Sequence, residues 1–526
     1  MPFFEKASTV ILALAIVLGL TLRLHMYLWN RSLWLDPAWL ALNIVDKNYL
    51  ALFGQLDGGQ MAPVGFLIAS KLIGSAFGYS ELSLTLLPFL FGIGALIIFL
   101  YLSVEVLGRS YAPLAFIPFA SCSTAIYYSG EFKQYSSDLF FSVLILLLTY
   151  RVLKERYARP WIAAFGIVGL TSVWFSYTAI LMLAGTSLAL FLNALRQRNP
   201  KILNVLIITV IIIFIHFLLL YFLQIRPATS EGMFTYWATG FAPLTPLSLK
   251  TMGWWYKMLV GYAKYPLGFH GYGIWFSLAS LVFGIIILNI FKSKRATSHL
   301  FFFPVILLIV VSIFHKYPIV TGQYDITSRS VLFTVPIAFI LVATGINSFA
   351  KLFPKSMFVT VILGVLLVYP SINHSFPFPK NFLREEMRPL VSYLYQHLSS
   401  EDSVYVYHPS VPAFRFYTRN NSIPFVDGKT VEANNLPKDL SRAMTGNRIW
   451  AIITHDYVKN HEIIRKELET RHGPVSCIKF PGAWLLLSRP SKRQDQSSIP
   501  RLRFFLSHHK SNFIWYMKDL LVGKTV

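Results

Sequence analysis

The sequence predicts a polytopic α-helical membrane protein of about eleven transmembrane helices, with a small C-terminal α/β domain outside the membrane. Of its 526 residues, 55% are hydrophobic and only 13% are charged, which is too apolar for a soluble domain of ordinary composition. Apolar runs of about 17 to 25 residues recur as far as residue 372, and a helix of that length crosses a ~30 Å hydrocarbon core. Beyond that point the composition becomes that of a soluble domain.

The eleven expected spans are 8–28, 82–104, 111–129, 136–152, 160–178, 180–195, 202–224, 272–291, 299–315, 329–348 and 356–372. Threading them alternately through the membrane brings four cation-rich loops to one side: Arg151/Lys154/Arg156/Arg159, Arg196/Arg198/Lys201, Lys292/Lys294/Arg295 and Lys351/Lys355. Because loops rich in Lys and Arg remain in the cytoplasm, this side is predicted to be cytoplasmic. Segments 29–81, 225–271 and the chain after about 373 are then outside.

The net charge of +23 comes mainly from these loops and from the last 36 residues. We therefore interpret it as the positive-inside pattern of a membrane protein, and expect no nucleic-acid partner. Cys122 lies in an apolar run and Cys477 in the soluble part, so no disulfide framework or cysteine-based metal site is predicted.

The chain divides into a transmembrane module (1–373), an external α/β domain (374–489) and a basic, aromatic tail (490–526) that we interpret as a membrane-surface segment. The domain shows no Gly-rich phosphate loop, paired metal ligands or nucleophile elbow, which favours a support or acceptor-docking role. Its expected helices are Met387–Leu398 and His461–His472, and its expected strands are Val404–Tyr407, Ile449–Thr454 and Trp484–Leu487.

Asp36 is the first candidate for chemistry, because it follows the first span directly on the outer side, in "SLWLDPAWLALNI". Ionisable groups at membrane depth are costly and mark sites by default. The alternative is a structural aspartate in an exposed loop or at a helix start, since Asp-Pro-Ala opens a helix well. The spacing alone does not separate these two interpretations.

A second cluster lies in "YYSGEFKQYSSDLFFSVLI" at the outer end of two spans. If the chain is helical from Glu131 onward, then Glu131, Tyr135 and Asp138 share one face at i, i+4 and i+7. Lys133 lies among them as a candidate cation. The alternative interpretation is a Lys133–carboxylate pair that only anchors the loop.

A third cluster, "HKYPIVTGQYDITSRSVLFTVP", places Tyr317 and Arg329 at the outer ends of two late spans. Arg329 is always charged, and its planar fork of donors suits phosphate. The alternative is that its side chain only extends to the membrane interface, where water solvates the charge. Lys264 and His270 in "GYAKYPLGFHGYG" are weaker candidates.

These residues fit transfer from a lipid-phosphate sugar. The acceptor hydroxyl must lose a proton to a carboxylate, and the departing phosphate requires charge neutralisation rather than protonation. A glycosidase usually needs two carboxyl groups, because its leaving group is an alcohol. No nucleotide or redox cofactor is expected, whereas a dependence on divalent metal stays open, because carboxylates alone do not distinguish a base from a metal ligand.

The segments "LWLDxAWLALNI", "APVGFLIASKLIGSAFGYSELSLTLLPFLFG" and "YYSGEFKQYSSDLF" resemble the GT-C superfamily of membrane glycosyltransferases. The branch they resemble is that of bacterial relatives of dolichyl-phosphate-mannose protein mannosyltransferases and lipid A aminoarabinose transferases. The resemblance covers residues 1 to about 350 in layout, and is specific over the first 140. The C-terminal α/β domain is also similar to that of bacterial members of this superfamily.

The resemblance implies that Asp36 is the catalytic base, and that Lys133, Arg329 and the "EFKQYSSD" segment belong to the donor phosphate and the cavity. Pro37 stands where the family has Glu after this Asp, which leaves open the acceptor choice and the level of activity. The implied partners are a polyprenyl-phosphate sugar, an envelope acceptor and the lipid bilayer. The implied location is the bacterial inner membrane, with the C-terminal domain periplasmic.

The leading hypothesis is therefore an inverting glycosyltransferase that acts on the outer face of the membrane. Two other classes remain open. A transporter or flippase of lipid-linked sugars would also carry many helices and buried charge, and a non-catalytic scaffold of envelope assembly would tolerate Pro37.

Overall fold

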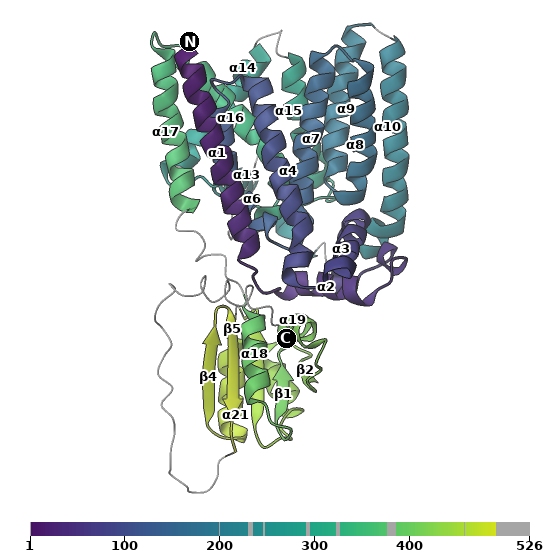
Figure 1. The fold of residues 1–526 in the computed structure, drawn as a ribbon, viewed down its shortest axis with the longest axis vertical. Helices are drawn as coiled ribbons and strands as arrows, with labels where there is room; N and C mark the ends of the chain where they lie inside the picture. The colour runs from purple at the N-terminus through teal and green to yellow at the C-terminus, as the bar shows by residue number, and fades with distance from the viewer. Residues whose placement is uncertain are drawn as a thin grey trace.

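In the computed structural model, a bundle of long helices stands on a small domain that contains a β-sheet (Figure 1). The structure describes residues 2–198, 200–229, 235–245, 248–290, 295–321, 327–375, 385–456 and 458–490. The predicted tail segment from 491 onward lies outside these residues. The N-terminus is at the end of the bundle far from the sheet (Figure 1).

Eight helices within the described ranges are long and apolar enough to cross a membrane. They correspond to eight of the eleven predicted spans. Six of them are single helices: α1 (Pro2–Leu28), α4 (Glu81–Leu107), α7 (Tyr135–Lys154), α9 (Ala179–Arg196), α14 (Tyr272–Ile290) and α15 (Arg295–Ile313). The other two are α10 (Pro200–Leu220), continued by η3 (Tyr221–Ile225) and α11 (Arg226–Ala228), and α16 (Val335–Ala350), preceded by η6 (Thr327–Thr334).

The helices at the three remaining predicted spans are not among those long and apolar enough to cross a membrane. The span expected at 111–129 is divided at Ser121 and Cys122 into α5 (Pro113–Ala120) and α6 (Ser123–Ser129). The others fall on α8 (Arg159–Phe175) and α17 (Ser356–Ser375), which run alongside the longer helices (Figure 1). The count of eleven spans therefore stays a prediction.

The centre of the bundle is α16, which packs closely against α14. A methyl group added at Gly345 would overlap the carbonyl oxygen of Ser280, and one added at Gly284 would overlap that of Leu341. Small residues allow helix backbones to approach closely in membranes, where packing rather than the hydrophobic effect drives association.

Two of the predicted cation-rich loops meet at the end of the bundle opposite the sheet domain. Glu105, near the C-terminal end of α4, accepts hydrogen bonds from Arg151 and Lys154, both at 2.7 Å. Lys351 lies over the ring of Tyr111, which follows α4, at 5.3 Å. The N-terminal residue of α4, Glu81, instead contacts the C-terminal domain. Lys292 and Lys294 lie outside the described residues.

The first external segment contains α2 (Leu35–Asp46), η1 (Ala51–Phe53), η2 (Asp57–Gly59) and α3 (Val64–Phe77), as expected for helices broken by Gly and Pro. The buried Lys71 of α3 donates to the carbonyl oxygen of Ile44 in α2 at 2.6 Å. This contact ties the two helices together beside the bundle. The second external segment contains η4 (Ala238–Gly240) and α13 (Leu249–Lys264).

The C-terminal domain is a five-stranded mixed sheet in the order β2-β1-β3-β5-β4. The central strands β1 (Ser403–Val406) and β3 (Ile449–Thr454) are parallel, and β3 pairs antiparallel with β5 (Ala483–Ser488). The rest of the domain is β2 (Val426–Asp427), β4 (Val475–Phe480), α18 (Met387–His397), η8 (His408–Ser410), α19 (Val411–Thr418), η9 (Ala433–Asn435), α20 (Leu436–Ser441) and α21 (Asn460–Arg471). The sequence indicated β1, β3, β5, α18 and α21, but not β2 or the partly exposed β4.

The domain and the first external segment share one hydrophobic core, to which Leu40 of α2, Phe66 of α3 and Phe414 of α19 contribute. Polar contacts border this core. Glu81 accepts from Arg388 at 3.0 Å and from the Tyr417 hydroxyl at 2.8 Å. The domain is thus packed against the end of the bundle where the candidate site residues lie.

Candidate active site

The site centres on Asp36, in the first turn of α2. The residue before this helix is Trp34, which provides no side-chain cap, so Asp36 is not the capping residue. Its carboxylate instead faces Arg329, with 3.5 Å between Oδ2 and Nη1. The Asp36 side chain is 27% exposed and the Arg329 side chain is 20% exposed, so a ligand can reach this pair. The structure thus brings together two predicted residues that are 293 positions apart.

The charge of Asp36 is set by competing effects. Burial raises the pKa of a carboxyl group, but the Lys133 ammonium and the Arg329 guanidinium lower it, and the pKa of Asp36 ends below its ordinary value. A hydrogen bond with Gln60 and the charge of His455 act in the same direction. Asp36 is therefore ionised at neutral pH.

Lys133 is a buried cation that interacts electrostatically with this carboxylate. It precedes α7, and its ammonium donates to the Gln60 side-chain oxygen. Burial lowers the pKa of Lys133 to about 8, although Asp36 opposes this effect. Gln60 therefore connects the two charged side chains, and the Lys133 charge depends on pH near neutrality.

Arg329 is held between aromatic rings at the start of the α16 span. Its guanidinium carbon lies 5.7 Å from the ring centre of Tyr135 and 5.4 Å from that of Trp237. Tyr317 supports the same turn, because its hydroxyl donates to the carbonyl oxygen of Ser330 at 3.0 Å. Tyr135 therefore contacts Arg329 directly, and Tyr317 contacts the residue that follows it.

Glu131 has a different position from the one predicted. Helix α7 begins at Tyr135, so Glu131 is not on its face with Tyr135 and Asp138. Glu131 forms an ion pair with Arg31 at 3.0 Å and accepts from the Trp34 ring nitrogen at 2.5 Å. With both oxygens occupied, Glu131 anchors the loop that carries Asp36.

Asp138 lies deeper in the bundle. Its carboxylate accepts from the Ser176 hydroxyl at 2.6 Å, and Ser176 also contacts the Thr178 hydroxyl at 3.2 Å. These contacts join α7 to the turn between α8 and α9. Asp138 is therefore a buried polar contact behind Tyr135 rather than a partner of Asp36.

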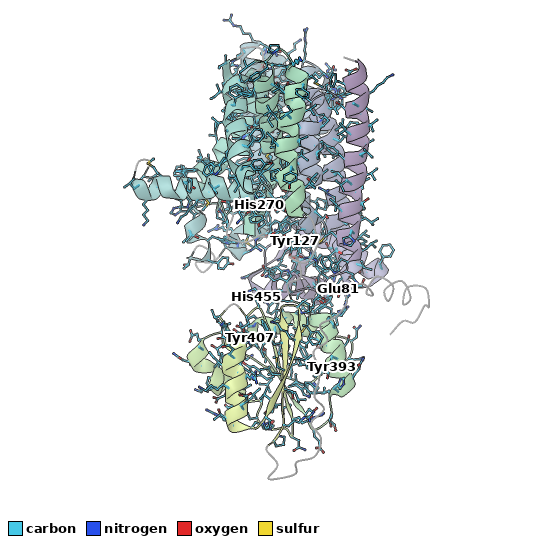
Figure 2. All side chains as sticks on the ribbon, turned by 90° about the vertical axis from the view of Figure 1, so that its left-hand side faces the viewer. Glu81, Tyr127, His270, Tyr393, Tyr407 and His455 are labelled. Atoms are coloured by element: carbon cyan, nitrogen blue, oxygen red, sulfur yellow. The ribbon has the colours of Figure 1, made fainter. Side chains whose placement is uncertain are left out.

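Lys264 and His270 contact Tyr265 rather than the charged centre. The Lys264 ammonium lies 5.5 Å from the Tyr265 ring centre, and the His270 ring packs edge-on against the same ring at 5.4 Å. Figure 2 shows His270 within the bundle, further from the C-terminal domain than Tyr127. Their predicted role in the cavity has no support in these contacts.

Sequence reasoning missed Gln60 and His455. Gln60 stands in "DGGQMAP", where an uncharged residue in a Gly-rich turn gives no chemical signal. His455 belongs to a domain more than 300 residues further along the chain, and it reaches the site only through docking of that domain (Figure 2). The described residues contain no group of three or more His, Cys, Asp or Glu side chains able to hold a metal ion.

No protein-family model matches the chain, and no curated protein matches its sequence. Solved structures with a similar fold include ArnT from Cupriavidus metallidurans in the apo state, with TM-score 0.52 and 10% identity over 91% of this chain and 97% of that one. The same protein bound to undecaprenyl phosphate matches with TM-score 0.52 and 11% identity over the same shares. AglB from Archaeoglobus fulgidus, an oligosaccharyltransferase in complex with an inhibitory peptide and a dolichol-phosphate, gives TM-score 0.49 and 11% identity over 95% of this chain and 75% of that one. The chain therefore has the fold of ArnT, and the resemblance expected from its sequence is confirmed at the level of the fold.

Proposed function

We propose that this protein is an inverting glycosyltransferase, which moves a sugar from a polyprenyl-phosphate carrier to a hydroxyl group of an envelope acceptor. The observation that carries the proposal is the juxtaposition of the Asp36 carboxylate with two cations, Arg329 and Lys133. The similarity in fold to ArnT, a protein solved with undecaprenyl phosphate bound, supports this donor class.

In the proposed reaction, the oxygen of the acceptor hydroxyl attacks the anomeric carbon, and Asp36 accepts the proton of that hydroxyl. The bond from that carbon to the phosphate oxygen breaks, and the polyprenyl phosphate leaves. Because the acceptor displaces the phosphate directly, the configuration at the anomeric carbon is inverted. Neither the residues nor the reaction requires a nucleotide.

Arg329 and Lys133 neutralise the charge that develops on the departing phosphate. Charges aimed at the position where charge develops are worth more in a partly buried site than in water. Arg329 presents a planar fork of donors and Lys133 a point charge. Trp237 and Tyr135, on either side of Arg329, restrict the orientation of the fork.

In this proposal, the reaction takes place on the outer face of a bacterial plasma membrane. The cation-rich loops with Arg151/Lys154 and Lys351 lie at the end of the bundle opposite Asp36. The positive-inside rule assigns the end with these loops to the cytoplasm. A polyprenyl carrier would then enter from the lipid, while the acceptor arrives beside the C-terminal domain.

The test is mass spectrometry of envelope glycolipids, glycans and glycoproteins from cells that contain the wild-type protein, the Asp36→Asn variant or no protein. We expect one sugar modification to be lost in the last two cases. Transport of a labelled lipid carrier without any product would instead support a flippase. An unchanged envelope in all three strains would contradict the proposal.

A further inference from the structure

Besides Arg388 and Tyr417, which contact Glu81, the C-terminal domain presents His455 to the bundle. His455 follows β3 directly, and its backbone is left-handed with φ 55°. Figure 2 shows His455 on the edge of the domain that faces the bundle. A non-glycine residue adopts positive φ at a cost, so this conformation persists where the surrounding contacts define it strongly.

The turn after His455 is anchored independently of the bundle. The carboxylate of Asp456 accepts from the backbone nitrogens of Asn460 at 2.7 Å and His461 at 2.9 Å, at the start of α21. A carboxylate at a helix N-terminus is a stabilising cap. The domain thus holds the His455 backbone in place from its own side.

The His455 ring connects the domain to the loop of Asp36. Its Nδ1 lies 2.8 Å from the Glu385 carboxylate, which is 5% exposed. The ring also lies parallel to the Trp34 ring, with 6.0 Å between centroids and 3° between planes. Trp34 is two residues before Asp36 and is itself fixed by Glu131.

We propose that His455, oriented by Glu385, is a positioning residue of the transfer site, through which the C-terminal domain fixes the Asp36 loop and adds a third cation beside its carboxylate. The inference rests on the proposed function for the role of Asp36. Its test, however, measures the ionisation of Asp36 and requires no turnover.

The charge argument is simple at the acid pH where a carboxyl group titrates, because an imidazole carries its proton there. The charged groups that act on His455 include Glu385, which bonds to its ring, and Asp36 across the domain boundary, while the neighbouring Asp456 pairs with His461. An imidazolium among them lowers the pKa of Asp36. Removal of this cation therefore makes Asp36 easier to protonate.

The experiment uses the full chain in lipid nanodiscs and the reagent dicyclohexylcarbodiimide, which modifies protonated carboxyl groups. Peptide mapping by mass spectrometry gives the pH at which half of Asp36 is labelled. His455→Phe keeps a flat ring against Trp34 but removes the charge, and His455→Gln keeps a hydrogen-bond donor for Glu385. In both variants we expect the half-labelling pH to rise by about half a unit or more.

His472→Phe is the matched control. His472 belongs to the same domain and contacts the Ser488 hydroxyl at 2.9 Å, at the end of the sheet where Ser488 pairs with Ile449. That end is remote from Thr454 and the bundle, so Asp36 labelling should match the wild type.

Equal half-labelling pH in the wild type and in the folded His455 variants would overturn the inference, and so would an equal shift in His472→Phe. If the Phe variant does not fold, the Gln variant decides. Should Asp36→Asn retain full turnover while the labelling shift is found, the proposed function fails and the inferred coupling stands.

Discussion

The Asp36 carboxylate is a weak proton acceptor in this structure, because two cations lower its pKa. A donor phosphate would draw these cations toward its own charge. The stabilisation of the Asp36 carboxylate would then decrease, and its pKa would rise toward that of a better proton acceptor. In this view, donor binding prepares the base for the acceptor.

Replacement of Asp36 by Asn keeps the size of the side chain but removes the proton acceptor. We expect turnover to fall by about 10² to 10⁴, the usual effect of losing a positioned base. Undecaprenyl phosphate should bind at least as tightly as to the wild type, because a negative charge beside the phosphate site is gone. Turnover and calorimetric binding of the purified variant test both points.

Asp57→Asn is the matched control, since Asp57 is 66% exposed in the same external segment and pairs with Lys47. It should behave as the wild type. Turnover of the Asp36→Asn variant within a few-fold of the wild type would exclude Asp36 as the base. Because Glu131 and Asp138 are both engaged, the base would then lie elsewhere.

In the proposed site, Lys133 would make the binding of the donor phosphate depend on pH. Its pKa is lowered to about 8 by burial, so the ammonium loses its proton as pH rises through that value. A bound phosphate favours the protonated form, and binding above pH 8 therefore requires proton uptake. We expect the affinity for undecaprenyl phosphate to fall between pH 7.5 and 9.5 by about tenfold.

Lys133→Arg tests the cause of this decline, since a guanidinium stays charged throughout the range. Its affinity should be nearly constant with pH, even if lower overall because the fork does not fit the Gln60 contact. A decline as steep as that of the wild type would show that another group titrates.

Arg329 should contribute both charge and geometry. Arg329→Ala removes a phosphate-neutralising charge, whereas Arg329→Lys keeps a point charge without the fork. At limiting donor we expect kcat/KM to fall in the order wild type, Lys, Ala, with the Ala variant reduced by about 10² or more. Equal rates for wild type and Ala would contradict the assignment of Arg329 to the phosphate.

Among the secondary-structure elements, the contact of α14 with α16 requires a glycine at position 345. A methyl group at Gly345 overlaps the backbone of Ser280, and a backbone oxygen cannot move aside as a flexible side chain can. We expect Gly345→Ala to lower the midpoint of thermal unfolding in detergent, with a cost of about 1–3 kcal/mol. The control is Gly253→Ala in α13, where nothing lies within 4 Å of the added carbon. Its midpoint should be unchanged or slightly higher.

The helices also show how much of the secondary structure can be predicted from the sequence. Hydropathy predicts the eight long spans because each requires only an unbroken apolar run. It misses the break at Ser121 and Cys122, since both are small residues within an apolar stretch. The span predicted at 136–152 agrees with α7, but a helix from Glu131 onward is wrong, because Arg31 and Trp34, which are distant in sequence, hold Glu131 outside the helix.

At the scale of the whole molecule, the predicted orientation can be checked with single cysteines. The exposed Cys477 is first replaced by serine, and Cys122 is buried. In intact cells, a membrane-impermeant maleimide should label Lys459→Cys, whose native side chain is 76% exposed. Arg196→Cys should react only after permeabilisation. Labelling of position 196 from outside would overturn the predicted topology.

The part of the site that the sequence predicts is the part with charge. Asp36, Lys133 and Arg329 are conspicuous because ions are costly near a membrane, and the structure brings them together. Gln60, Trp34 and His455 carry no such signal. Their roles depend on the fold of one loop and on the docking of a domain, and the periodicity of hydrophobic residues predicts neither.

The shared core has a consequence for synthesis. Ser32 bonds to Glu386, a partner 354 residues later in the chain, and the hydrophobic face of α2 and α3 is completed by the same late domain. At about 5–20 residues per second, a ribosome needs roughly 20–70 s to make the chain between these two residues. During that interval, the segment that carries Asp36 emerges with its apolar face uncovered. Pulse-labelled cells should therefore show protease-sensitive α2–α3 in nascent chains that end before residue 385, and protection only once the full domain has been translated and folded.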